Sequence, residues 1–522
     1  MPWGSDLASA RIHRVRLHEP EVGGREVRFS WEVTPASDLY ARTDGRLSFP
    51  PDLDLGAVPR ALWWRLAMLC LHPHWALLRP CRVELPIRLG PGERDFWLRL
   101  IEATVINLVE YGAAPRPGAA VDLVESGPAL TPVVLEGSSD RAAAAFSGGK
   151  DSLAQAALLA ELCERPLLVT TCSPVPWTND HSGAARERAK AEVVRRLPVE
   201  LIEVHSDFRT CTNHLFAAPG DGKLMVHELA DQPLFQAVTV AVAAASGISR
   251  SFMASEADIQ YNAHCPSGVL QHVAFPASAV TLGSLDTLLR QFGLGLGSLT
   301  YPLHTPQVQG LLCRRYPELV DLQWSCWEAL DGAQACSVCR QCTEIAFLVL
   351  AEGLSPAAVG IDPVRLLCTR AGLRAGGPAT SRKLHETRAP QEHTWRAVRA
   401  VPVERLREIL EGHPASCADP RLGEALEAYG LIHESAMALE LPPAPGYIGG
   451  FLESIDSALR DPLRAIIEEH FEPAPEAEFA AILGRSRALK RRITEPLGRY
   501  ESATRAPRPS PRAGGPPGER EA

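Results

Sequence analysis

The sequence predicts an α/β protein in which a parallel β-sheet carries helices on both faces, with further modules at either end. Between residues 142 and 254, short apolar runs alternate with longer segments in which apolar residues recur every three or four positions. A glycine-rich turn joins the first apolar run to the first helical segment. Such alternation implies parallel strands that bind ligands over their carboxyl ends.

The elements of the central region follow from these patterns in order. A strand at 142–146 ends at the glycine turn, and the residues after the turn have helical spacing. The remaining predicted strands are 167–171, 199–204 and 251–254, and the predicted helices are 184–196 and 235–245. We place this α/β domain at residues 139–353.

The region before the central domain has a different pattern. Two segments, 27–33 and 81–89, alternate apolar and polar residues as half-buried strands do. Helical spacing is found at 61–71 and 96–111. Residues 1–138 are therefore predicted to form an α+β accessory domain.

The region after the central domain is predicted to be a helical domain, residues 354–501. Its helical segments are 403–410, 422–433, 455–471 and 478–492. Joints that contain Pro and Gly separate these segments. Residues 502–522 are rich in Pro, Gly and Arg, and we expect this tail to be disordered.

Composition excludes several classes of protein. The chain has 522 residues, 46% of them hydrophobic, which is enough for a large buried core. A net charge of −9 argues against a general nucleic-acid-binding surface. The sequence has no apolar run long enough to span a membrane, and its first twenty residues lack the apolar core of a signal peptide. We expect a cytoplasmic protein without membrane contact, and a homodimer is compatible with these features.

The glycine turn is a hexapeptide with residues suited to phosphate binding. It consists of Ser147, Gly148, Gly149, Lys150, Asp151 and Ser152. Adjacent glycines let backbone N–H groups converge on an anion, and the helix that follows adds its N-terminal dipole. Lys150 supplies a positive charge, and the two serines supply hydroxyl donors. The turn predicts a nucleotide site, in which Asp151 is compatible with phosphates only when Mg²⁺ lies between them.

A second motif is a cluster of cysteines. Cys326, Cys336, Cys339 and Cys342 place two Cys-x-x-Cys steps behind a fourth thiol. Four thiolates make a closed tetrahedral zinc site, whereas a redox Cys-x-x-Cys pair, the alternative, would not need the other two. We expect structural Zn²⁺ here, with no open coordination position for catalysis.

The hexapeptide resembles the Ser-Gly-Gly-x-Asp-Ser loop of the PP-loop ATP pyrophosphatase superfamily, and it differs from the loops of kinases, GTPases and dinucleotide-binding proteins. The resemblance implies the HUP-type α/β fold, with ATP held by the loop and with Lys150 and Asp151 in catalytic roles. In that superfamily a substrate oxygen attacks the α-phosphorus, which gives an adenylated intermediate and finally AMP and pyrophosphate. The second strand usually contacts adenine through its backbone. The corresponding residues here are Val169, Thr170, Thr171 and Cys172.

The cysteine cluster resembles that of 7-cyano-7-deazaguanine synthases, which are PP-loop enzymes with a Cys₄ zinc site. The segment 325–342 matches theirs in the order and separation of its cysteines, with departures such as Trp327 and Ser337. The segment that contacts substrate in that family is kept only in part at 258–266. The resemblance therefore implies the ATP chemistry more strongly than the substrate.

Other candidate residues lie at the ends of the predicted strands. Glu256 and Asp258 follow the last predicted strand and are candidates for contact with substrate or metal; the alternative is that they cap a helix or turn. Some PP-loop enzymes transfer sulfur through a thiolate, for which this chain offers Cys172, Cys211 or Cys265.

Together these features predict an AMP- and pyrophosphate-forming ligase or synthase. It would adenylate a carboxylate or amide oxygen of a small-molecule or protein substrate. A first alternative is the ATP-dependent epimerase of UDP-N-acetylmuramoyl-L-alanyl-L-glutamate, whose family also has a Gly-Gly-Lys-Asp-Ser loop and a late cysteine cluster. A second is a nucleotide-binding or protein-modifying component of a defence system, in which ATP is bound but scarcely turned over.

Overall fold

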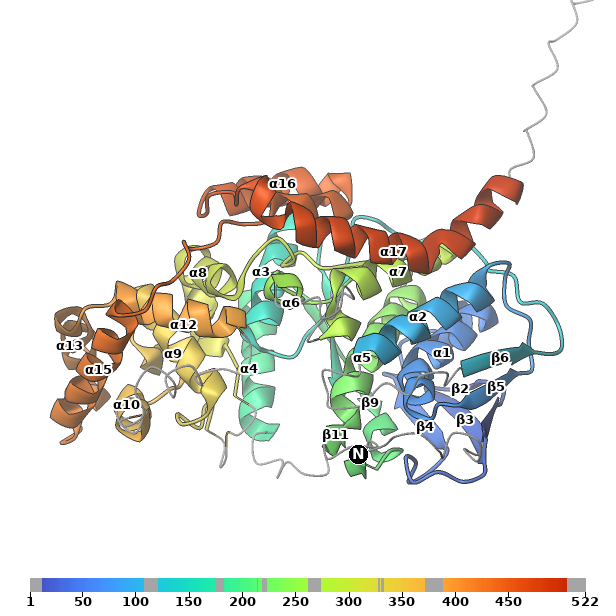
Figure 1. Ribbon diagram of the computed structural model, residues 1–522, viewed down its shortest axis with the longest axis horizontal. Helices are drawn as coiled ribbons and strands as arrows, with labels where there is room; N and C mark the ends of the chain where they lie inside the picture. Colours follow the sequence, from blue (N-terminus) through green and yellow to red (C-terminus); the bar gives the residue numbers. More distant parts are fainter. Residues whose placement is uncertain are drawn as a thin grey trace, which may run out of the picture.

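One long sheet runs through the computed structural model, which describes residues 12–107, 121–173, 183–213, 215–217, 223–261, 274–326, 329, 333–370 and 388–504. Its strand order in these residues is β13-β12-β7-β8-β9-β4-β3-β1-β5-β6, and β2 pairs with β3 beside this path. Figure 1 shows the N-terminal strands on one side of the molecule and the helices α10, α13 and α15 on the other.

Five parallel strands form the part of the sheet that the glycine turn belongs to. They are β7 (Ala143–Ala145), β8 (Leu167–Cys172), β9 (Glu200–Ser206), β12 (Arg250–Phe252) and β13 (Gly295–Gly297). The helices around them are α3 (Lys150–Leu162), α4 (Gly183–Arg196), α5 (Val226–Ala245) and α7 (Ala279–Leu289). A separate hairpin is formed by β10 (Leu215–Ala217) and β11 (Lys223–Met225). The predicted α/β fold with a mostly parallel sheet is confirmed.

Successive side chains of a strand point to opposite faces of the sheet, and in these strands both sets are apolar. Helices therefore cover both faces. Ala143 and Leu167 lie in one hydrophobic core together with residues of α5 and α7. Ala144 and Leu168 lie in a second core with residues of α3. All four side chains are buried. Consequently β7 ends between two packed layers, and the turn that follows it starts from a fixed position.

The N-terminal region extends the same sheet. Its elements are β1 (His13–Leu17), β2 (Glu21–Gly23), β3 (Glu26–Thr34), β4 (Asp44–Ser48), α1 (Arg60–Leu77), β5 (Cys81–Leu85), α2 (Glu93–Asn107) and β6 (Val121–Glu125). Strand β4 pairs antiparallel with β9, so that Leu47 lies opposite Ser206 and Ser48 opposite His205. The accessory region and the central strands are therefore joined by main-chain pairing.

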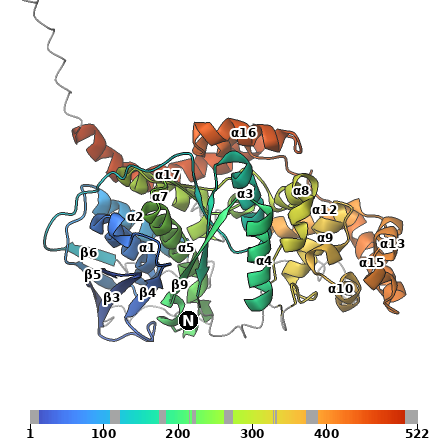
Figure 2. The same ribbon diagram turned by 180° about the vertical axis from the view of Figure 1, so that it is seen from behind.

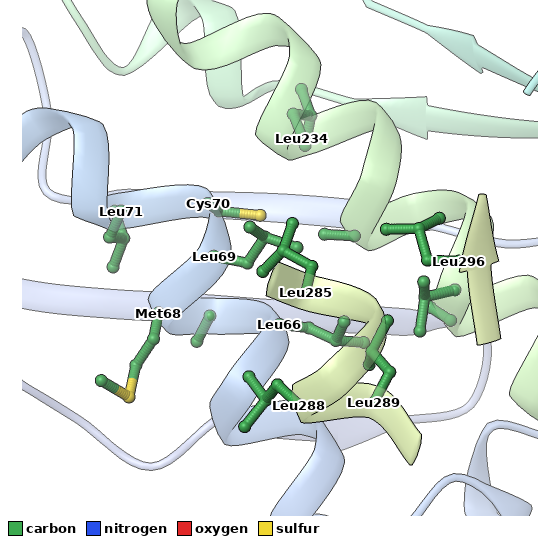
Figure 3. Close-up of a cluster of buried hydrophobic side chains, with 14 of the residues drawn as sticks. Leu66, Met68, Leu69, Cys70, Leu71, Leu234, Leu285, Leu288, Leu289 and Leu296 are labelled. Atoms are coloured by element: carbon green, nitrogen blue, oxygen red, sulfur yellow. The ribbon is translucent and has the colours of Figure 1, made fainter. Parts of the chain in front are cut away.

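Side-chain packing joins the two regions as well. Leu66 and Cys70 of α1 belong to one buried cluster with Leu234 of α5 and Leu285 of α7 (Figure 3). Helix α1 is buried along nearly its whole length, because α2 and α5 both pack against it. The predicted domain boundary near residue 138 is therefore crossed by a continuous hydrophobic core.

A buried ion pair ties α1 to α2 inside this core. The guanidinium of Arg65 donates to both carboxylate oxygens of Glu93, at 2.9 and 2.8 Å, and also to the carbonyls of Ala61 and Leu130. Its side chain is 1% exposed and that of Glu93 is 0% exposed. Each charge is stable in this environment only while the other is present.

The C-terminal helices fall into two groups. The first comprises α9 (Arg340–Ala351), α10 (Pro363–Arg370), α12 (Arg388–Ala400), α13 (Val403–Glu411), α14 (Pro414–Cys417) and α15 (Leu422–Met437). Phe347 of α9, Val398 of α12, Leu406 of α13 and Tyr429 of α15 share a third hydrophobic core. The helices α10 to α15 of this group fall within the predicted helical domain, whereas α9 precedes residue 354, where that domain is predicted to begin.

The second group returns to the sheet. Helix α16 (Ser457–Glu468) packs against α3, and α17 (Glu476–Thr504) packs against α7 and α2 (Figure 2). The last part of the predicted helical domain thus covers the central and N-terminal regions, because its apolar residues find partners there. Residues 505–522 of the predicted tail lie outside the described residues. None of the described helices combines the length and apolar character that crossing a membrane requires.

We expect Glu93→Ala to lower the free energy of unfolding by about 3–5 kcal/mol, because it leaves the Arg65 charge buried without its carboxylate. Urea unfolding of the full chain measures this loss. The matched control is Glu19→Ala, which removes the carboxylate bonded to Arg60, where the side chains are 46% and 50% exposed. Its effect should stay below about 1 kcal/mol. Similar losses in the two variants would contradict the importance of the buried pair.

Candidate functional site

The hexapeptide lies at the carboxyl end of β7 and leads directly into α3, as the sequence predicts. Gly148 has φ of +83°, a left-handed conformation that favours glycine, and Gly149 is the N-cap of α3. Ser152 braces the turn from the first helical turn. Its hydroxyl accepts from the amides of Ser147 and Gly148 at 3.3 and 3.1 Å and donates to the carbonyl of Gly149 at 3.0 Å.

Trp324 and Ser325, which precede the first cysteine of the cluster, hydrogen-bond to this turn. The amide of Trp324 donates to the carbonyl of Gly148 at 2.6 Å, and the amide of Lys150 donates to the hydroxyl of Ser325 at 3.3 Å. A Cβ atom at Gly148 would lie 3.5 Å from the Cβ of Trp324. The next residue is Cys326, so the backbone segment that contacts the turn leads directly into the cysteine cluster.

Lys150 lies among carboxylates, with 9% of its side chain exposed. Its ammonium donates to Asp151 Oδ1 at 2.5 Å and to Glu256 Oε2 at 2.8 Å. Burial alone would lower the pKa of Lys150, but the charges of Asp151 and Glu256 raise it above its ordinary value. Lys150 is therefore a permanent cation, and the structure brings together three of the predicted site residues.

Glu256 is fixed by a second contact. The hydroxyl of Thr305, the first residue of α8 (Thr305–Arg315), donates to Glu256 Oε1 at 2.6 Å. Asp151 is the more accessible of the two carboxylates, with 31% of its side chain exposed against 17%. Of these two carboxylates, Asp151 is the better placed to reach a ligand from solvent.

Asp258, at the start of α6 (Asp258–Tyr261), is held by three partners. Its carboxylate accepts from His304 Nδ1 at 2.6 Å, from the amide of Thr305 at 2.8 Å, and from His393 Nε2 at 3.0 and 3.1 Å. Asp258 and both histidines are buried. Burial would raise the pKa of Asp258, but His393 and His304 hold it well below its ordinary range. All of these partners belong to the protein, so the carboxylate is engaged within the fold.

Glu344 is another buried carboxyl group near Lys150. It lies on α9, two residues after Cys342, and burial raises its pKa to about 7. The charge of Lys150 opposes that rise, whereas Asp258 and Asp151 add to it. Glu344 therefore changes its charge near neutral pH. Its pKa depends on the charges of the candidate site.

The four cluster cysteines form a compact arrangement of sulfurs, each within 4.8 Å of the others. The Sγ atoms of Cys326 and Cys339 are 3.9 Å apart, and those of Cys336 and Cys342 are 3.8 Å apart. A tetrahedron with Zn–S bonds of about 2.3 Å requires sulfurs roughly 3.8 Å apart. Backbone amides point at the sulfurs, including that of Cys342 at Cys339 Sγ, 3.4 Å. The cluster could hold a metal ion such as zinc.

The strand predicted to contact adenine is β8. Val169 and Thr170 are buried, whereas Thr171 and Cys172 at its carboxyl end are half-buried. The hydroxyl of Thr170 donates to the carbonyl of Phe146 at 2.9 Å, which ties β8 to the start of the turn. The carboxyl end of β8 is therefore adjacent in the sheet to the turn.

The cysteines considered as nucleophiles are not activated. Burial raises the pKa of Cys172, and it raises that of Cys211 to about 12. Neither thiol is ionised at neutral pH, and the thiolate is the nucleophilic form. Cys265 lies outside the described residues.

Several residues of the site were missed by the sequence analysis. They are His304, Thr305, Trp324, Ser325, Glu344 and His393. His304 precedes Thr305-Pro306, which is a typical start of a helix and gives no sign of a contact with Asp258. His393 lies 135 residues from Asp258 in the sequence. Only Ser325 had a signal in the sequence, since it directly precedes the cluster residue Cys326.

Comparisons with known proteins find no relative: no protein-family model matches the chain, and neither the curated proteins nor the solved structures contain a match.

We expect the purified chain to contain about one zinc ion, held by the four cysteines. Cys339→Ser should release it and loosen the turn, because Trp324 and Ser325 then lose their anchor at Cys326. Metal analysis measures the first effect, and hydrogen exchange of residues 147–152 measures the second. Cys417→Ser, at an exposed cysteine, is the matched control and should change neither. Loss of zinc without faster exchange in the turn would contradict the coupling.

Glu344 should make the stability of the chain depend on pH around neutrality. Its pKa of about 7 in the folded state lies above the ordinary 4.5. The stabilisation that Glu344 adds to the free energy of unfolding is therefore complete below about pH 4.5. It is lost as the pH rises through about 7. Glu344→Gln should flatten the fall of the melting temperature between about pH 5 and 8. Glu408→Gln, at an exposed position of α13, is the control and should leave the wild-type slope; parallel curves for wild type and Glu344→Gln would refute the assignment.

Proposed function

We propose that the chain binds ATP with Mg²⁺ at residues Ser147 to Ser152 and forms AMP and pyrophosphate by adenylating a carboxylate or amide oxygen of its substrate. One observation carries the proposal. The complete hexapeptide Ser-Gly-Gly-Lys-Asp-Ser follows a buried parallel strand and opens a helix, so that its amides, its lysine and the helix N-terminus share one position. This arrangement suits the phosphates of a nucleotide.

The charges around the turn support phosphate chemistry. Lys150 remains protonated at neutral pH, since the carboxylates of Asp151 and Glu256 raise its pKa. On binding of a polyphosphate its ammonium can exchange a carboxylate for phosphate oxygens and offset the charge that grows on the leaving pyrophosphate. Asp151, the more exposed carboxylate, would hold a Mg²⁺ ion that bridges to the phosphates.

The turn holds its donors in a prepared position. Ser152 and Ser325 accept from the amides of Gly148 and Lys150, so the backbone is ordered before a ligand arrives. A phosphate would replace hydroxyl acceptors without reordering the chain. Positioning and electrostatics of this kind supply most of the rate in phosphoryl and nucleotidyl transfer.

The test is to measure AMP and pyrophosphate formed from Mg·ATP by the full chain, over a panel of carboxylic acids, primary amides and proteins. Appearance of both products with one class of co-substrate supports the proposal and identifies that class. Tight ATP binding with no turnover by any co-substrate would favour a nucleotide-sensing component. Absence of ATP binding would refute both.

Lys150→Met and Asp151→Asn should each lower AMP formation by at least about 100-fold, since each removes a charge aimed at the phosphates. Both substitutions nearly preserve side-chain volume, and the melting temperature checks that the fold is kept. Arg209→Met is the matched control, because Arg209 forms a similarly buried ion pair with Asp231 that belongs to no predicted site. Wild-type activity in both site variants would refute the assignment.

A further inference from the structure

A helix from the C-terminal region contributes to the surroundings of the candidate site. Helix α12 packs against α6, α8 and α9, and its residue His393 is buried against Asp258. The two rings of His393 and His304 lie edge to face, with centroids 5.7 Å apart, and both contact that carboxylate. Asp258 therefore joins α6, α8 and α12 at one point.

A chain of short contacts leads from His393 to the glycine turn. His393 Nε2 contacts Asp258, and a second partner of that carboxylate is the amide of Thr305 at 2.8 Å. The hydroxyl of Thr305 donates to Glu256 Oε1 at 2.6 Å, and Glu256 Oε2 accepts from Lys150 at 2.8 Å. Thr305 thus holds two carboxylates at once, one with its backbone and one with its side chain.

The protonation of His393 follows from its two neighbours. The carboxylate of Asp258 also accepts from the amide of Thr305, and an ionised carboxylate only accepts hydrogen bonds. His393 Nε2 must therefore donate. Arg396 Nη1 lies 3.1 Å from His393 Nδ1, and arginine only donates, so Nδ1 must accept. The tautomer of His393 that satisfies both contacts carries its proton on Nε2, and Arg396 orients the ring.

This tautomer argues against a metal ion at the cluster. The ligand atoms of Asp258, His304 and His393 lie within 4.8 Å of one another, as in a metal site. A metal would need the lone pair of His393 Nε2, which would put a proton on Nδ1 and set two donors against each other at Arg396. The distance of 2.6 Å from His304 Nδ1 to Asp258 is that of a direct hydrogen bond.

We propose that His393, oriented by Arg396, is a positioning residue for the nucleotide site: its Nε2–H fixes Asp258, and through Thr305 it fixes Glu256 against Lys150. The proposal rests on the proposed function in one respect, that the turn at Lys150 binds ATP. Asp258 then acts as the support of Glu256 and Thr305, in place of the substrate contact that the sequence suggested.

The first experiment needs no nucleotide. The rate at which acetic anhydride modifies Lys150 in the full chain, followed by mass spectrometry, reports whether Glu256 still holds the ammonium. His393→Leu fills the space but removes the donor, and should raise that rate at least about threefold. His393→Gln keeps an N–H donor at the same reach and should restore the wild-type rate. Thr305→Val, which breaks the middle contact without altering α12, should act like His393→Leu.

A matched control separates positioning from loss of packing. Val398→Ala removes a buried side chain of the same helix that belongs to the third hydrophobic core, which includes no member of the chain of contacts. It should lower the melting temperature and leave the modification rate of Lys150 unchanged. An equal rise in Val398→Ala and His393→Leu would mean that α12 acts only by packing and would overturn the proposal.

The second experiment measures the dissociation constant of Mg·ATP by calorimetry. His393→Leu and Thr305→Val should weaken binding about tenfold, and His393→Gln should stay near wild type. If wild type does not bind ATP, the proposed function fails while the modification rates still test the contacts. If wild type binds and His393→Leu binds equally well, only the positioning role fails. A second metal ion per chain that is lost in His393→Gln would replace the hydrogen-bonded cluster by a metal site and overturn the proposal.

Discussion

The buried ammonium group of Lys150 is the constraint on which the rest of the site depends. A charge withdrawn from water must be compensated by opposite charges within bonding distance. Asp151 is the next residue in the chain, but Glu256 has to be brought from the end of β12. The position of β12 beside β7, the start of α8 at Thr305 and the docking of α12 at Asp258 are all needed to keep that second carboxylate in place.

The same loop is also fixed by the cysteine segment. Trp324 and Ser325 contact Gly148 and Lys150 through hydrogen bonds that do not depend on charge. Two independent supports, one electrostatic and one through the backbone next to Cys326, therefore meet at the turn. Such a double support makes the turn more rigid than a glycine pair alone would be, because glycines lose the most conformational freedom on ordering.

The parts of the site that could be predicted from the sequence are those whose signals are local. Gly148 and Gly149 between an apolar run and a helical pattern predicted the turn, and the spacing of the cysteines predicted the sulfur cluster. Strand β13 was missed because Gly295–Gly297 is too short to show a pattern. The partners of Asp258 were missed because they lie 46 and 135 residues away, and only tertiary folding brings them together. The pairing of β4 with β9 involves only two positions in each strand, and it produces no recognisable pattern in the sequence of either strand.

The pairing of β4 with β9 also determines which strand edges the sheet exposes. An open edge offers unpaired N–H and C=O groups to other chains and is a site of aggregation. Strand β9, with seven residues, would be such an edge if the parallel strands ended there. In the described strands the sheet instead ends at β13, which has three residues, and at β6, whose five residues include Asp122 and Glu125. The N-terminal strands thus protect the parallel sheet against intermolecular association, independently of any chemistry at the turn.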